Sequence, residues 1–235
     1  MPDHIVTAYD QEISAIKTLL AQMGGMAEEQ LNNAITALAK RDLVLADLVI
    51  ARDEKLDVME RDIEEKATLT IAKRQPMALD LREIMVAIRV AADIERIGDL
   101  AKNTAKRTHA ISEALPRKLA TGLSRMGSMA QAQLKNVLDA YGLKDAEKAL
   151  SVWRSDEELD ALYNSIFREL LTYMMEDPRN IGMCTHLLFG AKNLERIGDH
   201  TTNIAENIYY LINGKTIAED RPKKDITSMM TGMEK

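Results

Sequence analysis

The sequence contains an internal repeat, and this feature restricts the possible folds more than any other. Shifted by 103 positions, residues 23–63 match residues 126–166 at 16 of 41 positions. Shifted by 100 positions, residues 91–105 match residues 191–205 at 8 of 15. Self-similarity over this length indicates two copies of one structural unit in tandem. The change in offset falls between the matching blocks, near Pro76 and Pro178, where turns are expected.

Both halves of the sequence have helical periodicity. Apolar residues recur at intervals of three and four, which is typical of amphipathic helices, and alternating strand patterns are almost absent. Aromatic residues make up only 4% of the chain and there are five prolines, which also favours helices. The sequence therefore predicts an all-α fold.

Capping and breaking residues divide each half into three long helices. Asp42 is a predicted N-cap of a helix that runs to about Arg74, and Asp145 has the corresponding position in the second half. Three further helices are predicted to have a proline in the first turn, namely Pro76, Pro116 or Pro178. Two helix ends are predicted at glycines, Gly142 and Gly214. Helices of about 30 residues joined by short turns pack as antiparallel neighbours.

We therefore expect two tandem three-helix bundles, six long helices in all. The predicted boundaries are 1–113 for the first bundle, 114–214 for the second and 215–235 for a flexible C-terminal tail. Cys184 is the single cysteine, so no internal disulfide is expected, and the net charge of −6 argues against nucleic acid as a partner. With no long apolar run and no visible signal peptide, we expect a cytoplasmic protein that does not insert into membranes.

Several acidic residues occupy positions that face other helices. In the series Ala46, Val49, Asp53, Leu56, Glu60 and Ile63 the steps alternate between three and four, which places Asp53 on the buried stripe. Asp156 has the same phase in the second half, and Glu95 follows a similar stripe in its own helix. An unpaired charge in such a position costs on the order of several kcal/mol of stability, because a buried ion loses its hydration.

These acids form four pairs, each spanning one helical turn: Asp53 with Asp57, Glu95 with Asp99, Asp156 with Asp160, and Glu195 with Asp199. Glu60, Asn103 and Asn203 lie close to them in helical phase and are further candidate ligands. Carboxylates one turn apart repel each other until a cation lies between them. Oxygen ligands suit Mg²⁺, Mn²⁺, Ca²⁺ or ferric iron, and pairing with arginines of other helices or protonation are the alternatives.

Gly98 and Gly198 occur within predicted helices, next to Asp99 and Asp199. Glycine is unfavourable inside a helix by about 1 kcal/mol relative to alanine. Two interpretations are open: close packing of helices, or space for a metal cluster beside the carboxylates.

The acidic pattern permits a metal-binding helical bundle, either without enzyme activity or as a ferritin-like di-metal enzyme, or a metal-free helical scaffold. Ferritin-like enzymes use Glu-x-x-His motifs. No histidine in this sequence has a glutamate three positions before it, since those positions hold Met1, Lys106, Met183 and Ile197. The pattern of an enzyme of that type is therefore absent.

Specific blocks of the sequence resemble the PhoU family of phosphate-specific transport accessory regulators. The Glu-Arg-Ile-Gly-Asp block occurs twice, at 95–99 and at 195–199, and Asp53-Glu54-Lys55-Leu56-Asp57 has a counterpart at 156–160. The segment from Arg74-Gln75-Pro76 to Asp80-Leu81-Arg82 is also similar to the family. The resemblance covers about residues 5–214.

This resemblance implies two three-helix bundles with multinuclear iron or zinc clusters. Asp53, Asp57, Glu95 and Asp99 would line one cluster, and Asp156, Asp160, Glu195 and Asp199 the other; Glu60 corresponds to Tyr163, so the second site has fewer acidic candidates. The resemblance also implies a non-enzymatic, homodimeric adaptor. It would couple a phosphate transporter ATPase to a sensor histidine kinase and keep starvation signalling off when phosphate is plentiful.

Overall fold

A computed structural model describes residues 2–111 and 115–218 of the chain, and within these ranges it contains helices and no strand. The long helices are α1 (Pro2–Lys40), α2 (Leu43–Arg52), α3 (Glu54–Arg74), α4 (Leu79–Ala110), α5 (Arg117–Leu143), α6 (Ala146–Glu176) and α7 (Ile181–Asn213), with one 3₁₀ turn, η1 (Pro178–Asn180). The predicted all-α fold is confirmed. The proposed boundary at 113 and most of the predicted tail, 219–235, lie outside the described residues.

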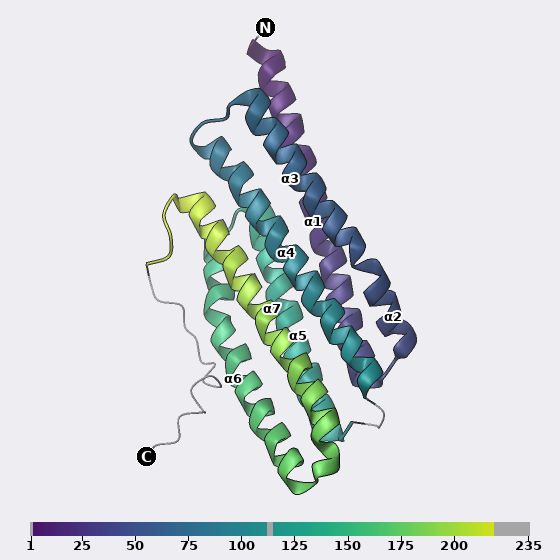
Figure 1. The fold of residues 1–235 in the computed structure, drawn as a ribbon. Coiled ribbons are helices and arrows are strands. Elements are labelled where there is room, and N and C mark those ends of the chain that lie inside the picture. Colours follow the sequence, from purple (N-terminus) through teal and green to yellow (C-terminus); the bar gives the residue numbers. More distant parts are fainter. Residues whose placement is uncertain (1, 112–114, 219–235) are drawn as a thin grey trace, which may run out of the picture.

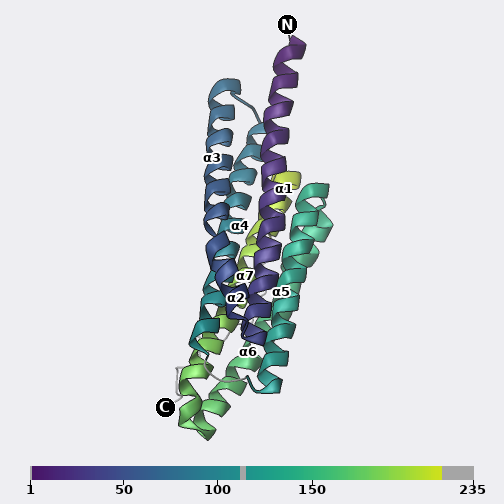
Figure 2. The same ribbon diagram turned by 90° about the vertical axis from the view of Figure 1, so that its right-hand side faces the viewer.

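The helices lie roughly parallel to one another in an elongated bundle (Figure 1). The first half of the chain forms α1 to α4, and the second half forms α5 to α7. Helix α4 packs along α7, and α1 packs against both α4 and α5. A view at right angles shows the same side-by-side arrangement (Figure 2). The two halves therefore share a long helical interface.

The helix predicted from Asp42 to Arg74 consists of two helices, α2 and α3, that meet at Asp53. Asp53 keeps helical dihedrals, with φ −60° and ψ −40°. The backbone N–H of Leu56 donates to the carbonyl of Asp53 at 2.8 Å, a three-residue spacing that tightens the turn. The chain is thus distorted at the first candidate metal ligand.

The connection between α3 and α4 also differs from the prediction. Helix α4 begins at Leu79, and Pro76 is not in its first turn. Gln75 has a left-handed conformation, with φ 48°, and its N–H donates to Ile71 O at 3.0 Å, which ends α3. Ala78 has φ 49° as well. The chain changes direction over residues 75–78, so α4 starts later than the sequence predicts.

Two predicted N-caps are confirmed. The side chain of Asp42 accepts from Leu45 N at 2.9 Å, and that of Asp145 accepts from Lys148 N at 2.9 Å. Gly214, with φ 72°, ends α7 as predicted. At the end of α5, however, the left-handed residue is Lys144 and not Gly142, so the helix is two residues longer than a cap at its glycine suggests.

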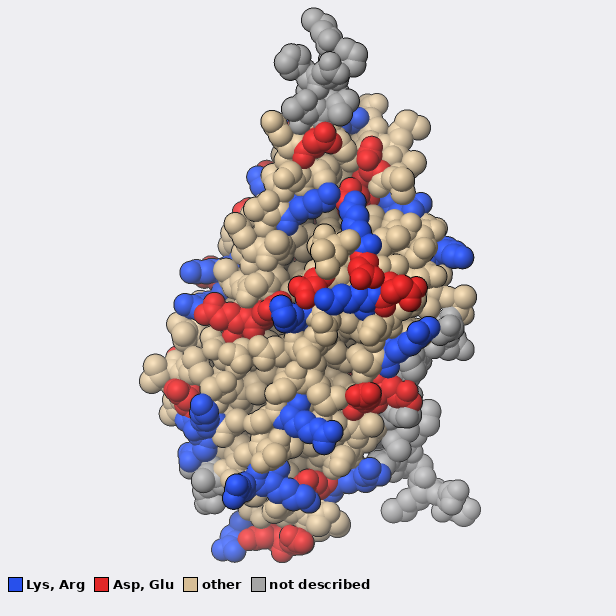
Figure 3. All heavy atoms as spheres, turned by 180° about the vertical axis from the view of Figure 1, so that it is seen from behind, with Lys and Arg blue, Asp and Glu red and all other residues tan. Residues whose placement is uncertain are grey.

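The core extends through both halves without interruption and consists of aliphatic side chains with Trp153 and Tyr163. On the face opposite that of Figure 1, acidic and basic side chains are interspersed with uncharged ones (Figure 3). Among the described residues, no helix has the length and apolar character needed to cross a membrane.

Candidate functional site

The acidic pairs are brought together between adjacent helices. Helix α3 packs against α4, so the pair that begins at Asp53 faces the pair that begins at Glu95. Helix α6 packs against α7 and brings the pairs of the second half together in the same way. We call Asp53, Asp57, Glu60, Glu95 and Asp99 the first cluster, and Asp156, Asp160, Glu195 and Asp199 the second cluster.

The first cluster contains a cation supplied by the chain. The ammonium group of Lys102, on α4, donates to Asp53 Oδ2 and to Asp99 Oδ1, the latter at 2.6 Å. Arg96 adds longer contacts, 3.4 Å to Glu95 and 3.6 Å to Asp99, but its side chain is largely exposed. Lys102 therefore joins the end of α2 to α4, in the place where the sequence predicts a cation.

Burial and neighbouring charges set the protonation of this cluster. Burial raises the pKa of the Asp53 carboxyl, although the hydrogen bond from Lys102 opposes the shift. Burial lowers the pKa of Lys102, but its bonds to Asp53 and Asp99 outweigh this and raise that pKa above its ordinary value. Burial also raises the pKa of Glu95, with Asp99, Glu60 and Asp57 adding to the effect. Asp57 and Asp99 thus act electrostatically on both Asp53 and Glu95.

The second cluster is more deeply buried than the first. Asp156, Asp160 and Glu195 are 1%, 2% and 3% exposed, whereas in the first cluster only Asp53 is fully buried. Lys192 forms an ion pair with Glu195 Oε1 at 2.9 Å and lies 5.0 Å from the centre of the Tyr163 ring. Lys192 corresponds to Ala92 in the first half. The lysines that pair with the two clusters, Lys102 and Lys192, are therefore not at equivalent positions of the repeat.

Burial strongly affects the carboxyl group of Glu195 in the second cluster. Its pKa is raised to about 7, mainly by burial; the hydrogen bond from Lys192 opposes the shift, and the charges of Asp199 and Asp160 contribute to it. Within the described structure its Oε2 atom has no hydrogen-bond partner. A buried carboxylate with one unsatisfied oxygen needs either a proton or a cation at neutral pH.

The glycines beside the clusters serve close packing in both halves. A Cβ atom on Gly98 would collide with Leu56 Cδ1, and one on Gly198 would lie 2.5 Å from Leu159 Cδ2. Leu56 and Leu159 correspond in the repeat, so each glycine leaves room for the equivalent leucine of the neighbouring helix. At Gly198 the space is also used by a carboxylate, because Asp156 Oδ1 would lie 2.6 Å from that Cβ atom.

Two buried glutamines beside these glycines were not identified from the sequence. Gln30 on α1 and Gln133 on α5 are 2% and 5% exposed, and their Oε1 atoms have no hydrogen-bond partner among the described residues. These atoms would lie 3.3 Å and 3.2 Å from a Cβ atom on Gly98 and Gly198, respectively. Gln30 and Gln133 match each other in the repeat, and this match could have identified them from the sequence.

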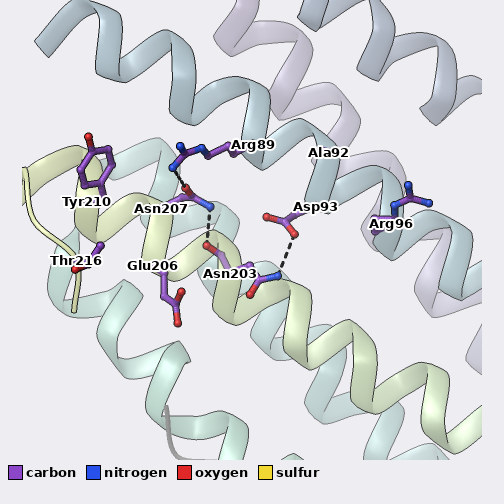
Figure 4. Close-up of a pocket in the computed structure, with 9 residues that line it drawn as sticks. All are labelled: Arg89, Ala92, Asp93, Arg96, Asn203, Glu206, Asn207, Tyr210 and Thr216. Carbon is purple, nitrogen blue, oxygen red and sulfur yellow. Dashed lines mark hydrogen bonds between the residues drawn. The ribbon is translucent and has the colours of Figure 1, made fainter. Parts of the chain in front are cut away.

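The asparagine candidates lie on α4 and α7. Asn103 is half-buried on α4. Asn203 lines a cleft of about 510 Å³ between α4 and α7 and donates to Asp93 Oδ1 at 3.3 Å (Figure 4). His200 Nδ1 lies 2.9 Å from the same Asp93 oxygen, and Arg89 donates to Asn207 at 3.5 Å. These contacts connect the two halves.

The donor atoms of the clusters are of a type that binds metal ions, but the side chains are not arranged around a common point. Within the described residues, no three carboxylate, imidazole or thiolate side chains are placed so as to hold one ion. The donors are oxygen atoms, which suit hard cations, and Gln133 adds a buried neutral oxygen beside Asp156. Metal loading would require carboxylates of a cluster to turn towards a common point.

Comparison with known proteins identifies the family. The sequence profile described as "PhoU domain" matches residues 20–108 and 123–208, once in each half. The chain belongs to the PhoU family. A relative from Rhizobium meliloti, named "Phosphate-specific transport system accessory protein PhoU homolog", is 57% identical over 97% of this chain and 96% of the relative. The Escherichia coli protein "Phosphate-specific transport system accessory protein PhoU" is 40% identical over 90% of this chain and 88% of its own length.

Solved structures of the family share the fold. The crystal structure of PhoU from Pseudomonas aeruginosa has a TM-score of 0.84 and 39% identity, with 88% of this chain and all of that chain covered. The phosphate transport system regulatory protein PhoU from Streptococcus pneumoniae gives 0.83 and 28%, with 90% of this chain and all of that chain covered. Members of this family are transport accessory and regulatory proteins and not enzymes, so the ferritin-like alternative is excluded.

Proposed function

We propose that this PhoU protein is a cytoplasmic negative regulator of phosphate uptake and of phosphate-starvation signalling. The observation that carries the proposal is the full-length similarity to a phosphate-specific transport accessory protein, 57% identical over 97% of the chain. Both PhoU domains are present. The similarity covers 96% of the relative's length, so the same regulatory task is expected.

The proposed partners are the ATPase of a phosphate ABC transporter and a sensor histidine kinase. As an adaptor, the protein would bind both when phosphate is plentiful, restrain uptake and keep starvation signalling off. We also propose that it acts as a homodimer. The name of the relatives, which places them with the phosphate-specific transport system, supports the first of these partners.

A genetic and a binding experiment test this role. Deletion of the gene should switch on a phosphate-starvation reporter in phosphate-rich medium, and the intact gene should restore repression. The purified protein should retain the transporter ATPase and the sensor kinase in pull-down assays. Normal repression in the deletion strain, together with binding to neither partner, would contradict the proposal and leave a scaffold with another task.

Metal binding by the acidic clusters is the second part of the proposal. The candidates are iron or zinc, with Mg²⁺, Mn²⁺ or Ca²⁺ as chemically suitable alternatives. Bound ions would neutralise buried carboxylates and cross-link α3 to α4 and α6 to α7. The protein's own residues would supply the oxygen ligands, and the packed helices would limit access of water to them.

Elemental analysis of natively purified protein tests this part. We expect bound metal, and a lower thermal unfolding temperature after treatment with a chelator. Absence of metal in native protein and in protein incubated with Fe²⁺, Zn²⁺ or Mn²⁺, with no effect of chelator on unfolding, would rule out metal binding and leave the regulatory role to be judged separately.

A further inference from the structure

We infer that the outer face of α2 and α3 is the contact surface between two copies of this chain. The two copies pair antiparallel, about a two-fold axis that passes between Val58 and Met59. This inference rests on the homodimer proposed above and specifies where its subunits meet. The residues that carry it occupy eight exposed positions, which we call the outer stripe: Val44, Leu48, Ala51, Lys55, Val58, Asp62, Glu65 and Leu69.

The outer stripe has the spacing of a helix face that packs against another helix. Its positions are separated alternately by four and three residues, which is a heptad pattern. All eight residues are exposed, on both sides of the turn at Asp53, whereas the opposite face of α3 is buried in the core through Leu56, Ile63 and Ala67. The stripe therefore follows the solvent side of both helices.

Helices α2 and α3 lie at the edge of the molecule. They pack against α1 and α4, and within the described residues they do not contact the helices of the second half. In Figure 1 they form the right-hand edge of the bundle. A second copy could therefore approach the outer stripe without displacing another helix.

The outer stripe exposes large apolar side chains. Val44 is 82% exposed, Leu48 is 41% exposed, and Val58 and Leu69 are each 44% exposed. Apolar side chains that are aligned on one surface indicate an interaction site, whereas isolated ones are ordinary. Pairing of two stripes would remove these side chains from water, and that burial favours association.

The second half has the equivalent helix but a different surface. The equivalents of the four apolar residues, 103 positions later on α6, are Glu147, Ser151, Ala161 and Thr172. These four residues are exposed as well, so both helices present this face to solvent. Large apolar side chains are thus found on the outer face of one repeat and not on that of the other. This difference indicates a contact made by the first half alone.

The charges of the stripe favour antiparallel pairing. With the axis between Val58 and Met59, Leu48 lies opposite Leu69 of the partner subunit. Lys55 then lies opposite Asp62 of the partner subunit, and the two-fold axis repeats each of these contacts. Parallel pairing would place each lysine opposite the same lysine of the partner subunit, and such like-charge contacts oppose association.

Light scattering during gel filtration of the full chain tests the location of the surface. Val58→Glu and Leu48→Glu are compared with Ala161→Glu and Ser151→Glu, which introduce the same charge at the equivalent exposed positions of α6. We expect the native protein and the α6 variants to be dimers. The other two variants should be monomers at the same concentration, because the dimer would bury their added carboxylates. Circular dichroism confirms that each variant is folded.

Exchange of the charged pair tests the orientation. Lys55→Glu or Asp62→Lys alone should weaken the dimer roughly tenfold, because each change places two like-charge contacts in the interface. The double variant restores opposite charges and should recover the native affinity. Analytical ultracentrifugation measures the dissociation constants. A double variant weaker than either single variant would exclude the antiparallel pairing.

A cross-link tests the position of the axis. Under mild oxidation Val58→Cys should form a disulfide-linked dimer, because the axis places this residue next to its own copy. The matched variant Ala161→Cys should remain unlinked. The native protein is the second control, since its single cysteine, Cys184, is buried. Equal cross-linking of the two variants would mean that the contact is not specific.

The outcomes separate this inference from the proposals on which it rests. A monomeric native protein would overturn the homodimer and this inference together. A dimer that is unaffected by Val58→Glu and Leu48→Glu would overturn only the assigned surface. The same would follow if these variants stayed dimeric but no longer retained the transporter ATPase or the sensor kinase, because the face would then belong to that partner.

Discussion

Gly98 and Gly198 set how closely the helices approach beside the acidic clusters. Each has a leucine of the neighbouring helix in the space where a side chain would start, Leu56 at Gly98 and Leu159 at Gly198. The sequence left close packing and space for ions as alternatives. The structure supports close packing at both glycines, and at Gly198 a carboxylate uses the same space.

Replacing either glycine with alanine should destabilise the protein. The added methyl group would force the leucine to move, at a cost of about 1–3 kcal/mol that exceeds the helix-propensity gain of about 1 kcal/mol. Gly25→Ala is the matched control, because nothing lies within 4 Å of its Cβ position on the exposed side of α1, and it should stabilise. Urea unfolding measures all three. Stabilisation by Gly198→Ala would show that the contact relaxes freely.

Glu195 gives the metal-free protein a pH-dependent stability. Its pKa is raised from 4.5 to about 7 by burial, so between these values the folded state binds a proton that the unfolded state has lost. Stability is therefore highest below about 4.5 as far as this group is concerned, and it falls as pH rises through about 7.

The variant Glu195→Gln removes this dependence. In chelator-treated protein, its free energy of unfolding relative to native protein should increase between pH 5 and pH 8, by up to about 3 kcal/mol. Denaturant titrations at several pH values provide the measurement, and groups common to both proteins cancel in the difference. A difference that stays constant across this range would mean that Glu195 titrates normally.

Some helix boundaries follow local sequence signals and others do not. Asp42 and Asp145 cap α2 and α6 through the same hydrogen bond, three residues along the chain. The ends are set by context: Lys144 and Gln75 adopt left-handed conformations where glycine or proline rules pointed to other residues. The tight turn at Asp53, which divides α2 from α3, has no breaking residue in the sequence at all.

Removal of either cap should cost a similar free energy. Asp42→Ala and Asp145→Ala each leave a helix N-terminus without its side-chain acceptor, which costs about 1 kcal/mol. Asp42→Ser and Asp145→Ser should recover most of the loss, because serine also accepts at this position. Thermal or urea unfolding measures each effect. Equal stability of the alanine and serine variants would mean that neither cap contributes.

At the scale of the molecule, α4 and α7 are the two central helices. Each carries acidic residues towards its own half, and the two pack against each other along their length. Polar contacts add to this interface, among them His200 with Asp93 at 2.9 Å. Two repeats that share so large an interface are expected to unfold together and not as separate domains.

The single tryptophan makes this testable. Trp153 lies in the second half, where its Nε1 donates to Glu206 at 2.9 Å, so its fluorescence reports on that half alone. Far-UV circular dichroism reports on the helices of both halves. We expect urea transitions from the two signals to coincide. A fluorescence transition well separated from the circular dichroism transition would indicate that the halves unfold independently.

Helical phase and the repeat determined the architecture from the sequence alone. Periodic apolar residues and capping aspartates predicted the order of the long helices, although one of them is divided into α2 and α3, because these signals depend on residues close together in the chain. The same phase placed Asp53, Asp156 and Glu95 towards neighbouring helices, since an acid on an apolar stripe must face whatever that stripe packs against. Family membership followed from the repeated Glu-Arg-Ile-Gly-Asp block and was confirmed by comparison.

What surrounds each carboxylate was decided only by tertiary structure. Lys102 reaches Asp53 across 49 positions of sequence, and Gln133 comes to Gly198 from a different helix. The two clusters look alike in the sequence, because the repeat matches their acidic residues. It does not reveal which side chains surround those residues. The neighbours of each buried carboxylate are side chains that packing brings together from distant parts of the chain.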